Sequence, residues 1–304
     1  MEYVLQTNGL TKIYGRAKVV NEVSMHVKKG SIYGFIGKNG AGKTTFMRMA
    51  AGLAAPSAGS MTIFGSSDLE KQRMRIGTLI ENPGIYPGMT ARDNLEVVRR
   101  SLGITEKSRV DEMLSITSLS NAGKKKVKNF SMGMKQRLGI AVSLLRNPDF
   151  LILDEPINGL DPAGIKEIRD LLIKLNNEKQ ITILISSHIL GELSKIATDY
   201  GIIREGVLIE EFGAGELETR CRRCLKLSVE HEHQAAGVLE EQLGIHNYDV
   251  PNPGELRVFE HLDHTAEINR VLIQNGVTLR ESYLAGQDLE GYFMQLLGNS
   301  TGKN

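Results

Sequence analysis

The sequence of 304 residues is 41% hydrophobic and 24% charged, which excludes a disulfide-stapled peptide and a disordered chain and suffices for about two domains. Its 37 Lys and Arg residues nearly balance its 36 Asp and Glu residues, and the net charge of +1 argues against DNA, RNA or a bilayer as a directly bound partner. No apolar run approaches the ~20 residues of a spanning helix, and the first 12 residues lack the features of a secretory signal. We therefore expect a cytoplasmic protein without membrane insertion of its own.

Short apolar segments alternate with helical patterns through residues 1 to about 213, which is typical of an α/β domain. In chain order we expect a strand at 31–36, a glycine-rich turn and a helix at 43–51. Further buried strands are expected at 150–153 and 181–185, because each is a short apolar run. The first domain is therefore predicted to contain a sheet with helices between its strands.

Residues 88 to about 147 carry a helical pattern, in which apolar side chains recur every three or four residues. Thr90 and Thr105 are expected to cap helices there. Glu205-Gly206, between two β-rich segments, predicts a hairpin turn. The α/β domain is thus predicted to hold an inserted helical subdomain.

The stretch Gly213-Ala214-Gly215 predicts a linker, followed by a second domain over residues 214–304. Alternating patterns indicate that this domain is small and mixed α/β. We expect strands at 224–229, 256–259 and 277–281 and helices at 235–243 and 265–275. Cys221 and Cys224 form a single CxxC, half of a four-thiolate zinc site, so a metal or redox role is disfavoured but stays open.

The most specific motif fits GxxxxGK[ST] and stands between the first expected strand and the first expected helix. Its residues are Gly37, Lys38, Asn39, Gly40, Ala41, Gly42, Lys43 and Thr44, with Thr45 next. The glycines allow the backbone to wrap so that N–H groups and the start of the helix face the phosphates of ATP. Lys43 would neutralise the β and γ phosphates, and the Thr44 hydroxyl would be a Mg²⁺ ligand. The alternative, a turn that binds nothing, is disfavoured by the flanking strand and helix.

Two carboxylates follow the apolar strand at 150–153, namely Asp154 and Glu155. Open α/β sheets bind ligands at the carboxyl ends of their strands. We expect Asp154 to face Mg²⁺ and Glu155 to be the general base that activates water. Acidic residues after a strand are also ordinary helix caps. The phosphate-binding motif upstream, called the P-loop (residues 37–44), favours the catalytic interpretation.

Residues 129–137, between these motifs, read Asn-Phe-Ser-Met-Gly-Met-Lys-Gln-Arg. This segment resembles the signature LSGGQxQR of the ATP-binding-cassette ATPases, with Met at two of its usual positions, and the resemblance covers residues 1 to about 213. It implies that Ser131 and Gly133 bind the γ-phosphate held by another subunit. A serine before an amphipathic run is also a common helix cap, and the two roles are compatible because a capped helix N-terminus is an anion site.

Further segments match the family in its usual order. Residues 158–162 resemble the D-loop, and His188 after a strand resembles the switch that contacts the γ-phosphate. Tyr14 resembles the aromatic residue that stacks on adenine, the alternative being a core tyrosine. Glu81 stands where the family usually has Gln, in the loop that contacts Mg²⁺, and a carboxylate near the metal is expected to strengthen cation binding.

Glu81 and the C-terminal segment 288–293 resemble the branch of the family that serves bacitracin- and lantibiotic-type peptide export and self-protection. For Glu81 the alternative is tolerated drift at a loop. The family resemblance implies a head-to-tail homodimer that traps two ATP molecules, and a separate membrane permease that holds the ATPase at the inner face of the cell membrane. A soluble ATPase of the same family, or an import ATPase with another cargo, stays open as an alternative.

Overall fold

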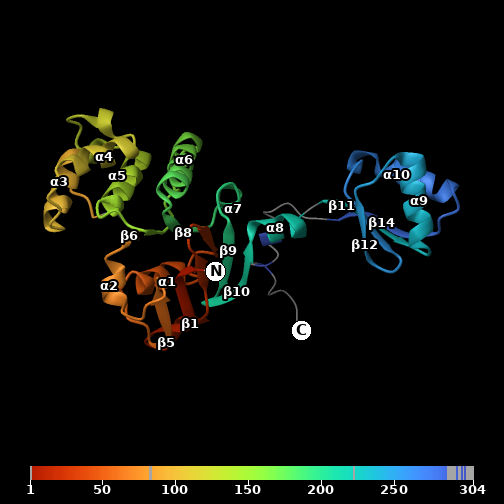
Figure 1. Cartoon of the computed structure of the whole chain (residues 1–304), viewed down its shortest axis with the longest axis horizontal. Coiled ribbons are helices and arrows are strands. Elements are labelled where there is room, and N and C mark those ends of the chain that lie inside the picture. Colours follow the sequence, from red (N-terminus) through yellow and green to blue (C-terminus); the bar gives the residue numbers. More distant parts are fainter. Residues whose placement is uncertain are drawn as a thin grey trace. The chain divides into compact units, whose positions relative to one another are not determined.

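A computed structural model describes residues 2–81, 84–221 and 223–285, together with residues 292, 293, 296 and 298. Two compact units, residues 1–214 and 215–304, divide the chain, and each is described by itself (Figure 1). The C-terminal segment 288–293 lies outside the described residues except for its last two positions.

A six-stranded sheet runs through the first unit in the order β10-β9-β4-β8-β7-β6. Its strands are β4 (Ile32–Ile36), β6 (Ile76–Leu79), β7 (Phe150–Leu153), β8 (Thr182–Ser187), β9 (Asp199–Arg204) and β10 (Val207–Gly213). Neighbouring strands are parallel except for β10, which pairs antiparallel with β9. Every residue of β4, β7 and β8 is buried, as expected of parallel strands covered on both faces. The three strands expected from apolar runs are confirmed, with ends shifted by up to two residues.

A second sheet of this unit is antiparallel, with β1 pairing with β2, β3 and β5. Its strands are β1 (Tyr3–Tyr14), β2 (Ala17–Val23), β3 (His26–Lys28) and β5 (Ala58–Ile63). Helix α1 (Lys43–Ala50) shares one apolar core with both sheets, through side chains such as Phe46 and Met47. This packing fixes the start of α1, and with it the glycine-rich loop that precedes the helix. The remaining helices outside the insertion are α2 (Leu69–Arg73), α6 (Pro162–Lys179) and α7 (Leu190–Leu193).

The helical insertion between β6 and β7 is present (Figure 1). It consists of α3 (Ala91–Ser101), α4 (Ser108–Ile116), η1 (Ser120–Ala122), η2 (Val127–Asn129) and α5 (Met132–Leu144). Thr90 caps α3 in a reciprocal capping box with Asp93, as predicted. Thr105 does not cap α4, which was a wrong prediction. The amides of Arg109 and Val110 bond to the carbonyl oxygens of the residues three positions earlier, so the chain tightens into the helix after Thr105 without a side-chain cap.

Helix α5 packs against β6, and at Gly77 the two backbones come close together. A Cβ at this position would overlap the carbonyl oxygen of Ser143 on α5. Glycine is therefore required here for packing, although its φ is not in the left-handed region. The contact connects α5, which carries most of the signature segment, to the strand that leads to Glu81.

The expected hairpin joins β9 to β10, and its turn residues Glu205 and Gly206 both have positive φ, as a type I′ turn requires. The expected linker at 213–215 was wrong. Strand β10 extends to Gly213, and helix α8 (Ala214–Cys221) begins at the next residue. The Ala214 amide still bonds to the Thr198 carbonyl oxygen, so the chain is held to the sheet up to the start of the helix.

The second unit contains a four-stranded antiparallel sheet in the order β12-β13-β11-β14. Its elements are β11 (Cys224–Val229), α9 (Glu232–Leu243), β12 (Tyr248–Asn252), β13 (Glu255–Val258), η3 (Leu262–His264), α10 (Thr265–Gln274) and β14 (Leu279–Ala285). Helices α9 and α10 accompany this sheet (Figure 1). Both long helices and β11 contribute to one apolar core. Strand β12 was not predicted, because Pro251 and a mostly exposed surface hide it in the sequence. Cys224 is a buried free thiol, and the described residues contain no cluster of metal-ligating side chains.

Candidate functional site

The glycine-rich loop lies between β4 and α1, and two of its glycines are required by close backbone contacts. A Cβ on Gly37 would lie 2.5 Å from the carbonyl oxygen of Ile203, and one on Gly42 would lie 2.6 Å from that of Val19. Gly42 also has φ 106°, which L side chains rarely adopt. The loop is therefore held tightly against neighbouring strands, with its last residue at the N-terminus of α1.

Lys43 begins α1, and its side chain is only 5% exposed. Its ammonium donates to the carbonyl oxygen of Gly37 at 2.5 Å and lies 3.3 Å from Glu155 Oε1. A buried ammonium needs partners of this kind, because an unpaired charge away from water is costly. The loop thus holds one cation at the point where the helix N-terminus also favours an anion.

Asp154 directly follows β7, and its carboxylate accepts hydrogen bonds from two hydroxyl groups. Thr44 Oγ1 donates to Asp154 Oδ2 at 2.7 Å, and Ser186 Oγ donates to Oδ1 at 2.6 Å. Ser186, at the end of the adjacent β8, also accepts from the Glu155 amide at 2.8 Å. Ser186 was not singled out from the sequence; its two contacts show that it orients both acidic residues.

Glu155 has φ 49°, a left-handed conformation that is strained for a side chain of this size. Its Oε2 lies 2.8 Å from His188 Nδ1. Its Oε1 is buried and forms no hydrogen bond within the described part of the chain, although Lys43 is near. His188 thus orients one carboxylate oxygen, while the other lies beside the Lys43 ammonium without a hydrogen bond and could accept a proton, as a general base must.

Tyr14 ends β1 and is 48% exposed, so it is not a core tyrosine. The Lys12 ammonium lies 4.9 Å from the centre of its ring, within range of a cation–π interaction. An exposed ring of this kind has a face for stacking.

Glu81 lies two residues beyond the end of β6 and has φ 61°. Its Oε1 lies 2.6 Å from Nη2 of Arg48 on α1, and its side chain is half exposed. The structure therefore pairs Glu81 with Arg48, a residue that the sequence interpretation did not consider. Their contact joins positions 33 residues apart, so no short motif could have signalled it.

Ser131 caps α5, accepting from the Met134 amide at 3.3 Å, as predicted. A hollow beside it is lined by Ser131, Gly133 and residues 159–161, where Asp161 caps α6. Within the described residues, no hydrogen bond or ion pair joins Ser131 or Gly133 to Lys43, Thr44, Asp154 or Glu155. Ser131 and Gly133 instead share a hollow with residues 159–161.

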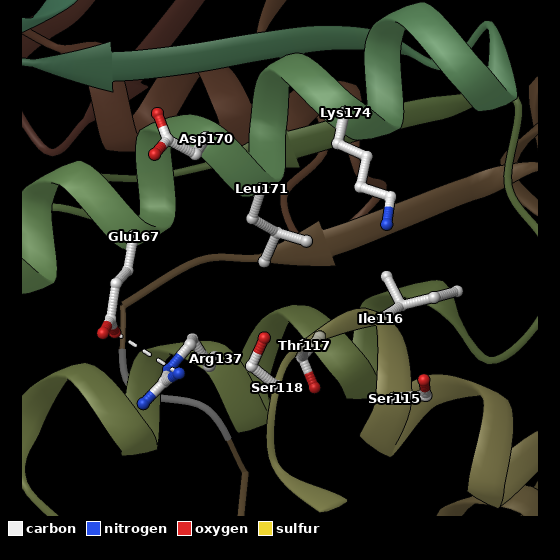
Figure 2. Close-up of a pocket in the computed structure, with 9 residues that line it drawn as sticks. All are labelled: Ser115, Ile116, Thr117, Ser118, Arg137, Glu167, Asp170, Leu171 and Lys174. Carbon is white, nitrogen blue, oxygen red and sulfur yellow. Dashed lines mark ion pairs between the residues drawn. The ribbon is translucent and has the colours of Figure 1, made fainter.

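A second hollow lies between α5, α6 and the end of α4 (Figure 2). Arg137 and Glu167 face each other across it at 3.3 Å and tie α5 to α6 (Figure 2). The same two residues also line the hollow beside Ser131. This ion pair thus helps to fix the position of the first half of α5 relative to α6.

The donor set at Thr44 and Asp154 fits Mg²⁺. A hydroxyl oxygen and carboxylate oxygens converge there, and Mg²⁺ prefers oxygen ligands, with one or two carboxylates and the phosphates of its nucleotide. When bound, the ion would neutralise phosphate charge; Thr44 and Asp154 would hold it.

Comparison with known proteins agrees with this geometry. The family model described as "ABC transporter" matches residues 20–158. Bacitracin transport ATP-binding protein BcrA of Bacillus licheniformis is 43% identical over 99% of each chain. The chain belongs to the ABC transporter ATP-binding family.

Lantibiotic transport ATP-binding protein SrtF of Streptococcus pyogenes is 44% identical over 68% of this chain and 90% of its own. In structure, cbiO1 of Clostridium perfringens, part of the ABC transporter complex cbiONQ, matches with a TM-score of 0.65 at 26% identity, covering 72% of this chain and 92% of its own. This ABC family member is the ATP-hydrolysing, nucleotide-binding subunit of a transporter. Among the described residues, no helix has the length and apolarity that crossing a bilayer needs.

Proposed function

We propose that this ABC ATPase powers the export of an antimicrobial peptide, or protection against one, through a separate membrane permease at the inner face of the cell membrane. The observation that carries the proposal is the similarity to a bacitracin transport ATP-binding protein over 99% of both chains. The carboxylate of Glu81, in place of the usual amide, supports the same branch.

In the proposed reaction, the P-loop residues 37–45 bind the phosphates of ATP, and Tyr14 stacks on the adenine. Lys43 turns from Glu155 toward the phosphates, because the more concentrated negative charge attracts the ammonium. Glu155 then takes a proton from the attacking water, and His188 keeps its carboxylate oriented. Burial of the Lys43 side chain, which is 5% exposed, strengthens its attraction to the phosphates.

Two copies are required in this proposal, because each ATP is enclosed by the P-loop of one copy and by Ser131 and Gly133 of the other. The exposure of Ser131 at a capped helix N-terminus, where an anion is favoured, supports this arrangement. The ATP-binding cassette MJ0796, whose fold is similar at a TM-score of 0.63 and 24% identity, is a dimer bound to ADP and Pi.

Permease docking is proposed at the helical subdomain, a few residues after Glu81. Tyr86, Met89 and Met132 are 52%, 37% and 54% exposed there. A hollow beside them is lined by Ile85, Pro87, Val127, Lys128, Met132, Lys135 and Gln136. Exposed apolar side chains around such a hollow are typical of a protein-binding surface.

Expression with its permease in a bacitracin- and lantibiotic-sensitive bacterium tests the proposed cargo. We expect a several-fold rise in the inhibitory concentration of one of these peptides with the unchanged chain, and none with Glu155→Gln. Glu178→Gln, an exposed carboxylate on α6, is the matched control and should protect fully. Normal ATPase activity without protection against either peptide would contradict the cargo class but not the enzyme.

Glu81→Gln is expected to keep ATP binding and to loosen the connection between hydrolysis and transport. The amide keeps the size of the side chain but loses the ion pair with Arg48. We expect protection per ATP hydrolysed to fall about two- to fivefold, as suits the ~0.5–1 kcal/mol of a partly exposed pair. The measurement compares ATPase rate and peptide protection for the same variant; if neither changes, Glu81 has no role in coupling.

A further inference from the structure

Two carboxylates lie at the same edge of the central sheet. Glu81 follows β6 and Asp154 follows β7, and these strands are parallel neighbours with Leu79 opposite Leu153. The Asp154 amide donates to the carbonyl oxygen of Leu79 at 2.8 Å, which fixes the ends of the two strands together. Both acidic residues meet α1, Asp154 at its first turn and Glu81 at its last turn.

Helix α1 contacts both carboxylates from one face. Thr44 and Arg48 are four residues apart and so lie one above the other on the helix. Thr44 donates to Asp154 at 2.7 Å, and Arg48 donates to Glu81 at 2.6 Å. One helix face thus presents a hydroxyl to one strand end and a guanidinium to the next.

We propose that Arg48 is a positioning residue that holds the Glu81 carboxylate and competes for it with the divalent cation of Mg·ATP. This inference rests on the proposed nucleotide site. A cation held by Thr44 and Asp154 would attract the carboxylate of Glu81 at the end of the neighbouring strand, and the guanidinium opposes this attraction.

The exposure of the pair suits reversible competition. The Arg48 and Glu81 side chains are 37% and 55% exposed, and ion pairs so open to water are weak. A divalent cation can therefore displace Arg48 without a large penalty. Arg48 would then limit how strongly the metal attracts the Glu81 carboxylate. A neutral amide at position 81 would not require such a partner, because it carries no charge.

A double-mutant cycle in the turnover-blocked Glu155→Gln chain tests this role. For each variant, calorimetric titration gives the affinity for ATP with Mg²⁺ and with EDTA, and the ratio of the two is the gain due to the metal. We expect Arg48→Gln to raise this ratio about two- to fivefold. In a Glu81→Gln background, Arg48→Gln should leave the ratio unchanged, because the competed carboxylate is gone.

Arg48→Lys is the conservative control and should restore part of the parental ratio, since it keeps the charge without the planar guanidinium. If Arg48→Gln raises the ratio equally with Glu81 present and with Glu81→Gln, the effect is one of general charge and the proposal is overturned. The proposal is also overturned if Arg48→Gln leaves the ratio unchanged or lowers it in the chain that keeps Glu81. Thermal unfolding of each variant verifies folding. Failure of the Glu155→Gln parent to bind ATP would overturn the proposed site itself, whereas ATP binding with an unchanged ratio overturns the role of Arg48 alone.

Discussion

Replacement of Glu155 by Gln is expected to lower the ATPase rate by about 10²–10⁴-fold, the range that a general base contributes. The amide keeps the size of the side chain but cannot accept the proton of the attacking water. It also removes a negative charge from beside Lys43, 3.3 Å away, so repulsion of the γ-phosphate falls. ATP binding should therefore persist, and Mg·ATP should produce a long-lived dimer.

Phosphate release gives the rate, and light scattering at saturating Mg·ATP gives the oligomeric state. Glu178→Gln, whose carboxylate is exposed on α6 and 4.0 Å from Lys174, serves as the control and should turn over normally. Turnover by the Glu155 variant near the unmodified rate would mean that another group is the base, and the strained backbone at Glu155 would then need a different explanation.

Local patterns in the sequence were sufficient to predict much of the nucleotide site. The P-loop and the acidic pair after β7 depend on short apolar strands followed by particular residues, and such strands are buried whatever the remaining topology. The caps at Thr90 and Ser131 follow from the same locality, because a cap bonds within three residues.

Contacts that depend on strand order were not predictable in the same way. Ser186 reaches Asp154 only because β8 lies beside β7, and Arg48 reaches Glu81 only because β6 is next to β7 over the same face of α1. The antiparallel sheet around β1 was also missed, since its strands are partly exposed and lack the continuous apolar runs of the central sheet. Long-range pairing, rather than propensity, places these residues.

A mixture of two inactive variants is expected to recover ATPase activity if each site is shared between copies. Lys43→Ala removes the buried ammonium of the P-loop, and Gly133→Asp places a carboxylate at the N-terminus of α5. Position 133 has room for a side chain, since an added Cβ would lie 3.9 Å from Leu160, so the fold should persist while the charge repels the γ-phosphate. Gly133→Ala, with the same Cβ and no charge, should lose much less activity.

Each variant alone lacks one half of every site. In an equal mixture, half of the dimers contain one copy of each variant, and one of their two sites combines an intact P-loop with an intact signature, so activity should reach up to about a quarter of the unmodified level. Sites made within single chains could not recover in this way, because each chain would carry its own defect. Mixed dimers that form by light scattering yet stay inactive would therefore contradict the shared site, whereas recovery in proportion to the mixed dimers assigns the signature of each copy to the ATP of its partner.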